Sequence, residues 1–325
     1  MTYIAPATKI LRYPNTLAAM LRGERVWPLH VEFDLAGVCN LSCRHCRFGG
    51  RQDGAVMAET DARIILDELY AGGTNAVTLS GGGEPTMNPR FAAIAQYAHN
   101  VGLAVGVYSN GVNRQALVDA APWCDWIYVS LDAADAESYA RVKGADRFDN
   151  VCGTIVELSK RTRTLGVGFL LSDENLRHVF SMRRLGQELG VDYVQFRPVA
   201  GLDSYDWVDA ALENLAQLLS PVYSPDRFRD LMDDKYSEYA RGYTTCRASE
   251  LVPAIGADGT VWVCPNTRGM KGRSLGNLHE ETFARLWARR PTQCVGDDCE
   301  PTCRNHQLNK TLEFVCTEQA HEEFV

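Results

Sequence analysis

Short apolar runs alternate with longer amphipathic segments between residues 31 and 198. The apolar runs are rich in β-branched and aromatic residues, which favour strands, and they occupy residues 31–36, 76–80, 103–108, 126–131, 167–171 and 193–198. Between these runs, apolar residues recur at helical spacing in residues 61–71, 89–101, 114–121 and 176–189. Strands that alternate with helices in this way predict an α/β fold with a parallel sheet and right-handed crossovers.

The pattern changes on both sides of this region. Residues 1–30 form a short extension that contains Trp27 and Pro28 and is expected to pack under or across the first strand. Residues 201–245 carry clustered charge and are interrupted by Pro221 and Pro225, which predicts a helical linker. We therefore expect four parts: an N-terminal extension at 1–30, an α/β core domain at 31–200, a helical linker at 201–245 and a Cys-rich domain at 246–325.

The Cys-rich region has its own composition. Gly, Pro, Cys and Asn are frequent there, and only residues 282–288 predict a helix. Asp258 and Gly259 lie between the apolar residues 253–257 and 260–263, which predicts a β-hairpin. Because so short a region has a thin apolar core, we expect metal clusters to cross-link it.

Charge and cysteine content exclude several classes of protein. The chain of 325 residues has 33 basic and 41 acidic residues and a net charge of −8, which disfavours a nucleic-acid partner held by bulk electrostatics. We find no secretion signal and no apolar run near the ~18 residues that a membrane helix needs, so we expect a cytoplasmic protein without a membrane partner. In that compartment, 11 cysteines indicate metal or cluster ligation rather than disulfides.

Three of the cysteines, Cys39, Cys43 and Cys46, lie in one loop after the first predicted strand, with the spacing C-x3-C-x2-C. Thiolates at this spacing suit an iron–sulfur cluster or a zinc ion. If the group is a [4Fe–4S] cluster, three cysteines leave one iron open to a small molecule. A structural zinc loop is the alternative, although no fourth ligand is evident nearby.

Polar residues follow the ends of the predicted strands. The second strand runs into Gly81, Gly82, Gly83 and Glu84, where glycines let the backbone approach a ligand closely and the carboxylate lies beside them. A plain Gly-rich turn is the alternative interpretation. Short polar side chains at the ends of the next strands are Ser109, Asn110, Ser130 and Asp132. Because ligands gather at the carboxyl ends of parallel strands, these residues predict a binding site.

The cysteine loop and the Gly-Gly-Glu turn together resemble the signature motifs of the radical S-adenosylmethionine (SAM) enzymes, over residues 31 to about 200. The resemblance implies a partial (β/α)6 TIM-like barrel, a [4Fe–4S] cluster on Cys39, Cys43 and Cys46, and SAM bound to the open iron. His45 stands where the family usually has a Tyr or Phe that packs on the adenine. The residues that the resemblance places near SAM are His45, Gly82, Gly83, Glu84, Ser109, Asn110, Ser130, Asp132, Leu171 and Arg197.

Some of these residues have ordinary structural alternatives. Asn110 and Gly111 fit a turn. Leu171 fits a core position, and Arg197 fits a structural ion pair as well as a pair with a carboxylate of the cofactor or substrate.

The later cysteines resemble a second family element. Cys246, Gly259 and Cys264 are spaced C-x12-G-x4-C, as in the opening of the SPASM domain or its shortened twitch form, which binds auxiliary [4Fe–4S] clusters in many radical SAM enzymes. The resemblance implies one or two auxiliary clusters. The implied ligands are Cys246, Cys264 and Cys303 for the first cluster, and Cys294, Cys299 and Cys316 for the second.

One thiol of the SPASM pattern is missing near Pro291. Asp297, Asp298 or a bound small molecule would then complete the second cluster. One or two zinc ions in a ribbon-like domain are the alternative for the whole region.

The resemblance implies a reaction in which SAM is cleaved to a 5′-deoxyadenosyl radical that abstracts hydrogen from an unactivated C–H group. It also implies an electron donor such as flavodoxin or ferredoxin. If the reaction is an epimerisation, a thiol must donate a hydrogen atom, and Cys124 and Cys152 are the candidates.

Because only 30 residues precede the first strand, we expect a small-molecule substrate, such as a sugar, aminoglycoside or nucleoside of natural-product biosynthesis, that is oxidised or epimerised. Peptide-modifying relatives often carry a leader-recognition domain ahead of the barrel. A peptide or protein maturase is the alternative function. A non-enzymatic iron–sulfur electron carrier or zinc-binding module is an alternative of a different class.

Overall fold

The structure is a computed structural model that describes residues 7–49, 53–172, 175, 178–199, 242–293, 295, 299, 303 and 305–317. Most of the predicted linker at 201–245, together with Cys294, Asp297 and Asp298, lies outside these residues. Within them, no helix has the length and apolar character needed to cross a bilayer.

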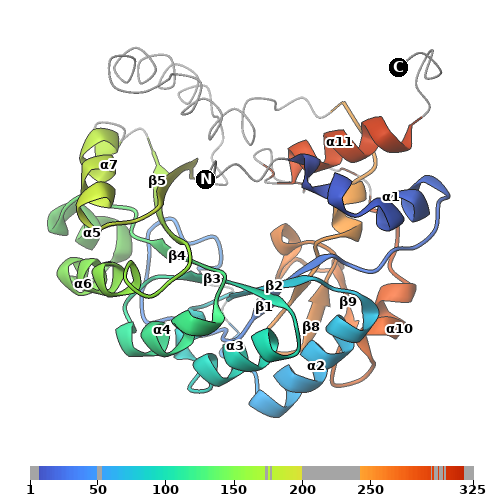
Figure 1. Cartoon of the computed structure of the whole chain (residues 1–325), viewed down its shortest axis with the longest axis horizontal. Helices are drawn as coiled ribbons and strands as arrows, with labels where there is room; N and C mark the ends of the chain where they lie inside the picture. The colour runs from blue at the N-terminus through green and yellow to red at the C-terminus, as the bar shows by residue number, and fades with distance from the viewer. Residues whose placement is uncertain are drawn as a thin grey trace.

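A curved sheet of nine strands organises the described part of the chain (Figure 1). Its strand order is β6-β5-β4-β3-β2-β1-β7-β8-β9, and all neighbours from β6 to β1 are parallel. The parallel strands are β1 (His30–Asp34), β2 (Ala76–Ser80), β3 (Ala104–Ser109), β4 (Trp126–Ser130), β5 (Leu165–Leu171) and β6 (Tyr193–Pro198). The predicted α/β class, the parallel sheet and the open, partial barrel are thereby confirmed.

Helices connect successive parallel strands and lie along one side of the sheet (Figure 1). They are α2 (Glu59–Gly72), α3 (Phe91–Asn100), α4 (Arg114–Ala120), α5 (Ala136–Lys143), α6 (Phe148–Leu158) and α7 (Val179–Glu188). The strands read as continuous apolar runs because both faces of the sheet are covered, and Phe33, Leu79 and Val107 are fully buried.

Two of these helices, α5 and α6, were not predicted. The α5 sequence AESYARVK has few apolar residues, and α6 contains Val, Thr and Ile together with Gly153, all of which lower helix propensity. Val151, Ile155 and Leu158 nevertheless share one buried face of α6. Packing of that face on the sheet therefore outweighs the unfavourable local propensity.

The Cys-rich region extends the same sheet. The predicted hairpin is confirmed as β7 (Ala254–Ile255) and β8 (Thr260–Trp262), which pair antiparallel around Gly259 at φ +81°. β9 (Ser274–Asn277) follows β8, and β7 pairs in parallel with β1. The hairpin is thus joined to the barrel strands by backbone hydrogen bonds rather than forming a sheet of its own.

Among its described residues, the Cys-rich region contains an α-helix that was not predicted. The expected helix is α10 (Phe283–Ala288), capped by the Thr282 side chain. A further helix, α11 (His306–Cys316), contradicts the prediction that only one helix follows residue 245. Its buried face holds His306 and Asn309 beside Leu312, so the apolar spacing that reveals a helix in the sequence is interrupted by polar residues.

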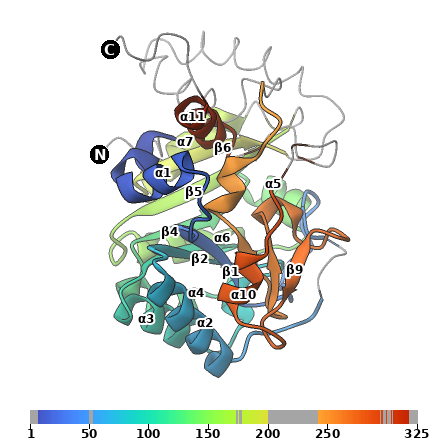
Figure 2. The ribbon, with the colours of Figure 1, turned by 90° about the vertical axis from the view of Figure 1, so that its right-hand side faces the viewer.

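The N-terminal extension packs against the Cys-rich region. Helix α1 (Pro14–Leu21) lies beside α11, as Figures 1 and 2 both show. These helices share a second, smaller apolar core whose buried members are Ile10, Leu17, Met20, Val26, Ala248, Leu251, Val252 and Leu312. The Trp27 indole donates to the Leu69 carbonyl of α2 and packs edge-on against Phe283, so it lies between α2 and α10.

A buried ion-pair cluster connects the Cys-rich region to β1. The Arg268 guanidinium lies 2.6 Å from Glu32 and 3.1 Å from Asp34, which are both on β1. Asp34 also accepts a hydrogen bond from Ser80 at the end of β2. Burial raises the pKa of Asp34 to about 6, and the negative charge of neighbouring Glu32 adds to this rise. Arg268 and the hydrogen bonds to Asp34 lower the pKa, but they offset the rise only in part.

The Asp34→Asn variant should change how stability depends on pH. The folded protein holds a proton on Asp34 up to about pH 6, whereas the unfolded chain releases it near pH ~3.9, so the Asp34 contribution to stability falls as pH rises through this window. Between pH ~7 and pH ~4, the free energy of unfolding of the wild type should change by about 2–3 kcal/mol relative to the variant, in favour of the wild type at low pH. Urea unfolding at a series of pH values measures this difference, and parallel pH profiles for the two proteins would contradict the assignment.

Candidate functional site

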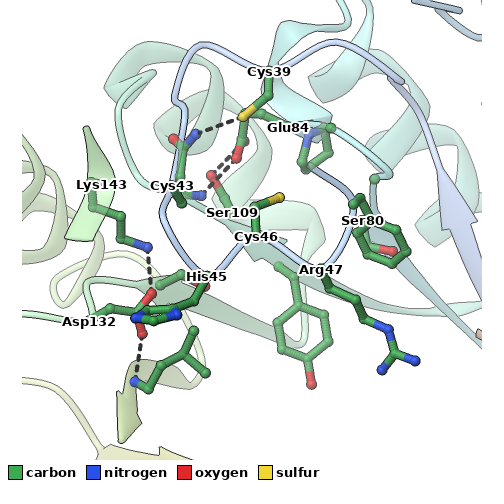
Figure 3. A pocket seen from close by; sticks show the side chains of 18 of the residues that line it. Cys39, Cys43, His45, Cys46, Arg47, Ser80, Glu84, Ser109, Asp132 and Lys143 are labelled. Carbon is green, nitrogen blue, oxygen red and sulfur yellow. Dashed lines mark hydrogen bonds and ion pairs between the residues drawn. The ribbon is translucent and has the colours of Figure 1, made fainter. Parts of the chain in front are cut away.

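The carboxyl ends of the parallel strands open onto a cavity of about 380 Å³ (Figure 3). All three cysteines of the predicted cluster loop line it. The lining residues are Glu32, Cys39, Cys43, His45, Cys46, Arg47, Phe48, Ser80, Gly81, Gly83, Glu84, Pro85, Tyr108, Ser109, Asn110, Ser130, Asp132, Val142, Lys143, Leu170, Arg197, Pro265, Asn266 and Arg268. The structure therefore brings together most of the residues that the sequence placed near SAM, with Gly82 and Leu171 as the exceptions.

The glycine turn after β2 holds the base of the cysteine loop. The amide of Gly83 donates to the Ala36 carbonyl at 3.0 Å, and the amide of Glu84 donates to the Val38 carbonyl at 2.8 Å. A Cβ atom on Gly83 would lie 2.0 Å from the Val38 oxygen. Gly83 is therefore required for close contact within the chain itself, and its amide already has a partner.

Gly82 lies apart from the cavity wall. Its amide donates to the Asp34 carboxylate, and a second cavity that includes Asp34 and Arg268 adjoins it. The expectation that Gly82 faces the cofactor is not met by this placement.

Glu84 joins the ends of β2 and β3. Its carboxylate is buried and accepts hydrogen bonds from the Ser109 hydroxyl at 2.7 Å, the Asn110 amide at 2.7 Å and the Thr86 hydroxyl at 2.7 Å. Burial raises the pKa of Glu84, and these hydrogen bonds counteract the rise. A carboxylate with several donors is held rigidly, so Glu84 fixes the relative position of two strand ends at the cavity.

Asn110 extends this network to the cysteine loop. Its side-chain nitrogen donates to Asn40 at 2.7 Å and lies 3.9 Å from the Cys39 sulfur. Its side-chain oxygen accepts from the Val112 amide, which is ordinary turn chemistry. Both interpretations of Asn110 from the sequence are thus compatible with the structure.

Asp132 and Lys143 form a buried ion pair at the other side of the cavity (Figure 3). Asp132 has φ +58° and also accepts from the Leu170 amide at 2.9 Å. Burial disfavours the charge of Lys143, but the adjacent Asp132 and Cys43 raise its pKa above the usual value. The backbone of Arg44 donates to Val142 on the same helix end, so α5 supports the cysteine loop.

Lys143 was missed in the sequence. It is the last residue of α5, where a basic side chain ordinarily interacts with the helix dipole at the surface. The sequence carries no signal for this position, because only the fold shows that the end of α5 returns to Asp132.

The remaining predicted contacts divide between cavity and core. Arg197 lies over the rings of Tyr108 and Tyr128, at 5.6 and 5.0 Å from their centroids, and donates to Gln195. Leu171 is 1% exposed and belongs to the main core, which agrees with the interpretation of this residue as a core leucine. Successive residues of a strand point to opposite faces, and Leu170 is the neighbour that lines the cavity.

A smaller cavity in the Cys-rich region is lined by four cysteines: Cys246, Cys264, Cys299 and Cys303. Cys299 therefore lies with the three residues assigned to the first auxiliary cluster, and not with Cys316. Cys316 packs against the smaller apolar core, beside Arg247 and Glu250. Cys294 lies outside the described residues.

Neither candidate hydrogen donor lines one of the two cavities that hold the clustered cysteines. Cys124 is 5% exposed in the main core, its thiol donates to the Ala120 carbonyl, and burial raises its pKa to about 12. Cys152 packs against the same core from α6, and burial raises its pKa to about 11. These environments are those of structural thiols.

The donor sets fit clusters better than single ions. Among the described residues, no three His, Cys, Asp or Glu side chains converge in the way that ligands of one metal ion do. In a cluster each cysteine binds a different iron, so the thiols stand around a cavity instead of meeting at a point. Both sets of cysteines have that arrangement.

Comparison with known proteins finds a matching family model and several relatives in sequence. Residues 35–185 match the family model of the Radical SAM superfamily. The mycofactocin maturase MftC of Mycolicibacterium smegmatis is 27% identical over 298 residues, which are 86% of this chain and 75% of that protein. The AdoMet-dependent heme synthase of Methanosarcina barkeri is 30% identical over 171 residues, which are 50% of this chain and 48% of that protein.

Solved structures share the fold. SuiB of Streptococcus suis, bound to S-adenosylmethionine, has a TM-score of 0.67 and 16% identity over 87% of this chain and 71% of its own. The protein anSMEcpe with bound AdoMet has a TM-score of 0.62 and 16% identity over 91% of this chain and 86% of its own. Residues 35–185, which carry the cysteine loop on a partial barrel, thus match the radical SAM superfamily in sequence, and the described fold is shared with these solved structures.

Proposed function

We propose that this radical SAM enzyme modifies a peptide. The observation that carries the proposal is the match to mycofactocin maturases, because it covers 86% of the chain and so extends well beyond the radical SAM domain. Solved structures of the same fold include SuiB bound to the precursor peptide SuiA and anSMEcpe bound to an 18Cys-type peptide. The peptide alternative thereby replaces the small polar metabolite as the favoured substrate.

The first cavity fits the cofactors of the superfamily. Cys39, Cys43 and Cys46 would hold the [4Fe–4S] cluster, and His45 lies on the same wall for contact with the adenine. When bound, cluster and SAM together supply a 5′-deoxyadenosyl radical that abstracts a hydrogen atom. The chain contributes rigid positions for these groups through Glu84, and it excludes water through the buried strand ends.

The Asp132–Lys143 pair constrains how the ribose would be held. One carboxylate oxygen of Asp132 accepts from Leu170 and the other pairs with Lys143. Ser130 lines the cavity at the end of β4, so its hydroxyl is the side-chain group that we assign to the ribose hydroxyls.

The size of the cavity favours a substrate that enters only in part. About 380 Å³ is a typical volume for the site of one drug-sized ligand, and SAM is itself of that size. Cluster and SAM would therefore fill most of this volume, so only a small part of a substrate, such as one side chain of a peptide, would enter beside them.

Formation of 5′-deoxyadenosine tests the cofactor assignment. Reduced, reconstituted wild-type protein should release 5′-deoxyadenosine from SAM, and Cys43→Ala should abolish this release because the cluster loses one of its three ligands. Cys152→Ala is the matched control, since this thiol lies outside both cavities, and it should retain most of the activity. Wild-type protein that binds iron but never cleaves SAM would contradict the assignment.

Pooled substrates test the peptide proposal. Synthetic peptides of mixed sequence should raise 5′-deoxyadenosine release several-fold above the substrate-free rate, because an occupied site promotes productive cleavage. Pooled nucleosides and aminoglycosides should leave the rate unchanged. Stimulation by the small molecules alone would contradict the peptide proposal. It would favour the hypothesis of a small-molecule substrate that is oxidised or epimerised.

For the Cys-rich region we propose one auxiliary [4Fe–4S] cluster held by Cys246, Cys264, Cys299 and Cys303. The four thiols share a cavity, and Cys246 lies close enough to Cys299 and Cys303 for their charges to raise its pKa further. This ligand set differs from the one implied by the SPASM pattern, which assigned Cys299 to a second, incompletely ligated cluster. It also leaves no iron open for direct anchoring of a substrate.

Iron and sulfide content tests this ligand set. Wild-type protein should hold about 8 irons per chain, four in each cluster, and Cys299→Ala should hold markedly fewer. Cys316→Ala should keep the full content, because Cys316 lies at the far end of α11 from Cys303. Zinc in place of iron, about 12 irons, or equal losses in the two variants would contradict a single four-cysteine cluster.

A further inference from the structure

The wall between the two cysteine-lined cavities is the short helix η6 (Pro265–Thr267), which directly follows Cys264. Asn266 lines both cavities. We propose that Asn266 is a positioning residue that connects the two cluster sites: it donates hydrogen bonds to thiolates of the auxiliary cluster, is oriented by Arg47 of the first cysteine loop, and makes the auxiliary cluster easier to reduce. This inference rests on the auxiliary cluster of the proposed function.

On the auxiliary side, Asn266 directs two N–H groups at cysteine sulfurs. Its backbone amide lies 3.4 Å from the Cys264 sulfur, and its side-chain nitrogen lies 3.9 Å from the Cys303 sulfur. The two cysteines are far apart in sequence, and Asn266 contacts both. Hydrogen bonds to cluster sulfurs stabilise the more negative, reduced state, so they raise the reduction potential.

On the barrel side, Asn266 is held by the residue that follows Cys46. Arg47 donates to the Asn266 backbone oxygen at 3.0 Å and to its side-chain oxygen at 3.3 Å. Arginine has donors only, so the amide oxygen must face Arg47 and the amide nitrogen must face Cys303. The cation also polarises the amide, which strengthens the N–H as a donor.

The segment around Asn266 is fixed on both sides, so the orientation persists. Thr267 donates through its amide and its hydroxyl to the Cys264 carbonyl, at 3.0 and 2.9 Å. Arg268, the next residue, is anchored to Glu32 and Asp34 on β1. Asn266 therefore needs no rearrangement to serve both cavities.

The experiment isolates the auxiliary cluster in the full-length chain. The triple variant Cys39→Ala, Cys43→Ala, Cys46→Ala lacks the ligands of the first cluster and should retain about four irons. In this background, a redox titration followed by electron paramagnetic resonance gives the midpoint potential of the auxiliary cluster. Asn266→Asp keeps an acceptor for Arg47 but removes the donor to Cys303, and it should shift the potential to more negative values.

We expect a shift of at least about 59 mV, which corresponds to a tenfold change in a one-electron equilibrium. Asn277→Asp is the matched control: it adds the same charge in the same region, but Asn277 donates to the Asp258 carbonyl and does not line the four-cysteine cavity. Its shift should be less than a third of that of Asn266→Asp. Equal potentials for the Asn266 variant and its parent, or equal shifts for the two variants, would overturn the inference.

If the Asn266→Asp variant does not take up iron, a second variant still tests the inference. Arg47→Met removes the cation that orients and polarises Asn266, so it should shift the potential in the same direction, and an unchanged potential there would overturn the inference. If the triple variant holds no iron, this result would contradict both the auxiliary cluster and the inference that rests on it. The 5′-deoxyadenosine assay on the wild type tests the radical SAM activity independently of both results.

Discussion

The contact on which the site depends is a close approach of two backbones. The cysteine loop leaves β1 and passes so near to Gly83 that no side chain fits between them, and two backbone hydrogen bonds join the segments. These bonds place the first turn of the loop relative to β2. Glu84, the next residue, continues the connection to β3 through buried hydrogen bonds. The positions of the three thiols thus follow from backbone geometry more than from contacts of the thiols themselves.

The strands were predictable because each is rich in apolar residues that the sheet buries, and two of the predicted ranges, 76–80 and 193–198, have the bounds of β2 and β6. Helices with unfavourable local composition were not predictable from the sequence. In α6, burial of Val151, Ile155 and Leu158 outweighs β-branching and a glycine, and in α11 polar residues occupy the buried face. Tertiary packing decides these segments, and a single sequence does not display it.

The site shows a similar division. Motif residues at strand ends, such as Ser109 and Asn110, could be located from the sequence because the carboxyl ends of parallel strands meet at one edge. Lys143 and Arg268 could not, since they enter the cavity from an unpredicted helix and from a distant region. Leu170 and Leu171 are neighbours on one strand, and their side chains point to opposite faces of the sheet. A prediction of the strand alone does not decide which of the two faces the cavity.

The parallel pairing of β7 with β1 has a consequence for how substrate reaches the site. Domains joined only by a linker can swing apart around a hinge, whereas strands of one continuous sheet move as a unit. The β7–β8 hairpin is therefore held against β1, at Glu32 and Phe33, as the cofactors and substrate come and go. Access to the barrel mouth must then depend on the rearrangement of loops and side chains around its rim, and not on a clamshell opening between the barrel and the β7–β9 hairpin layer.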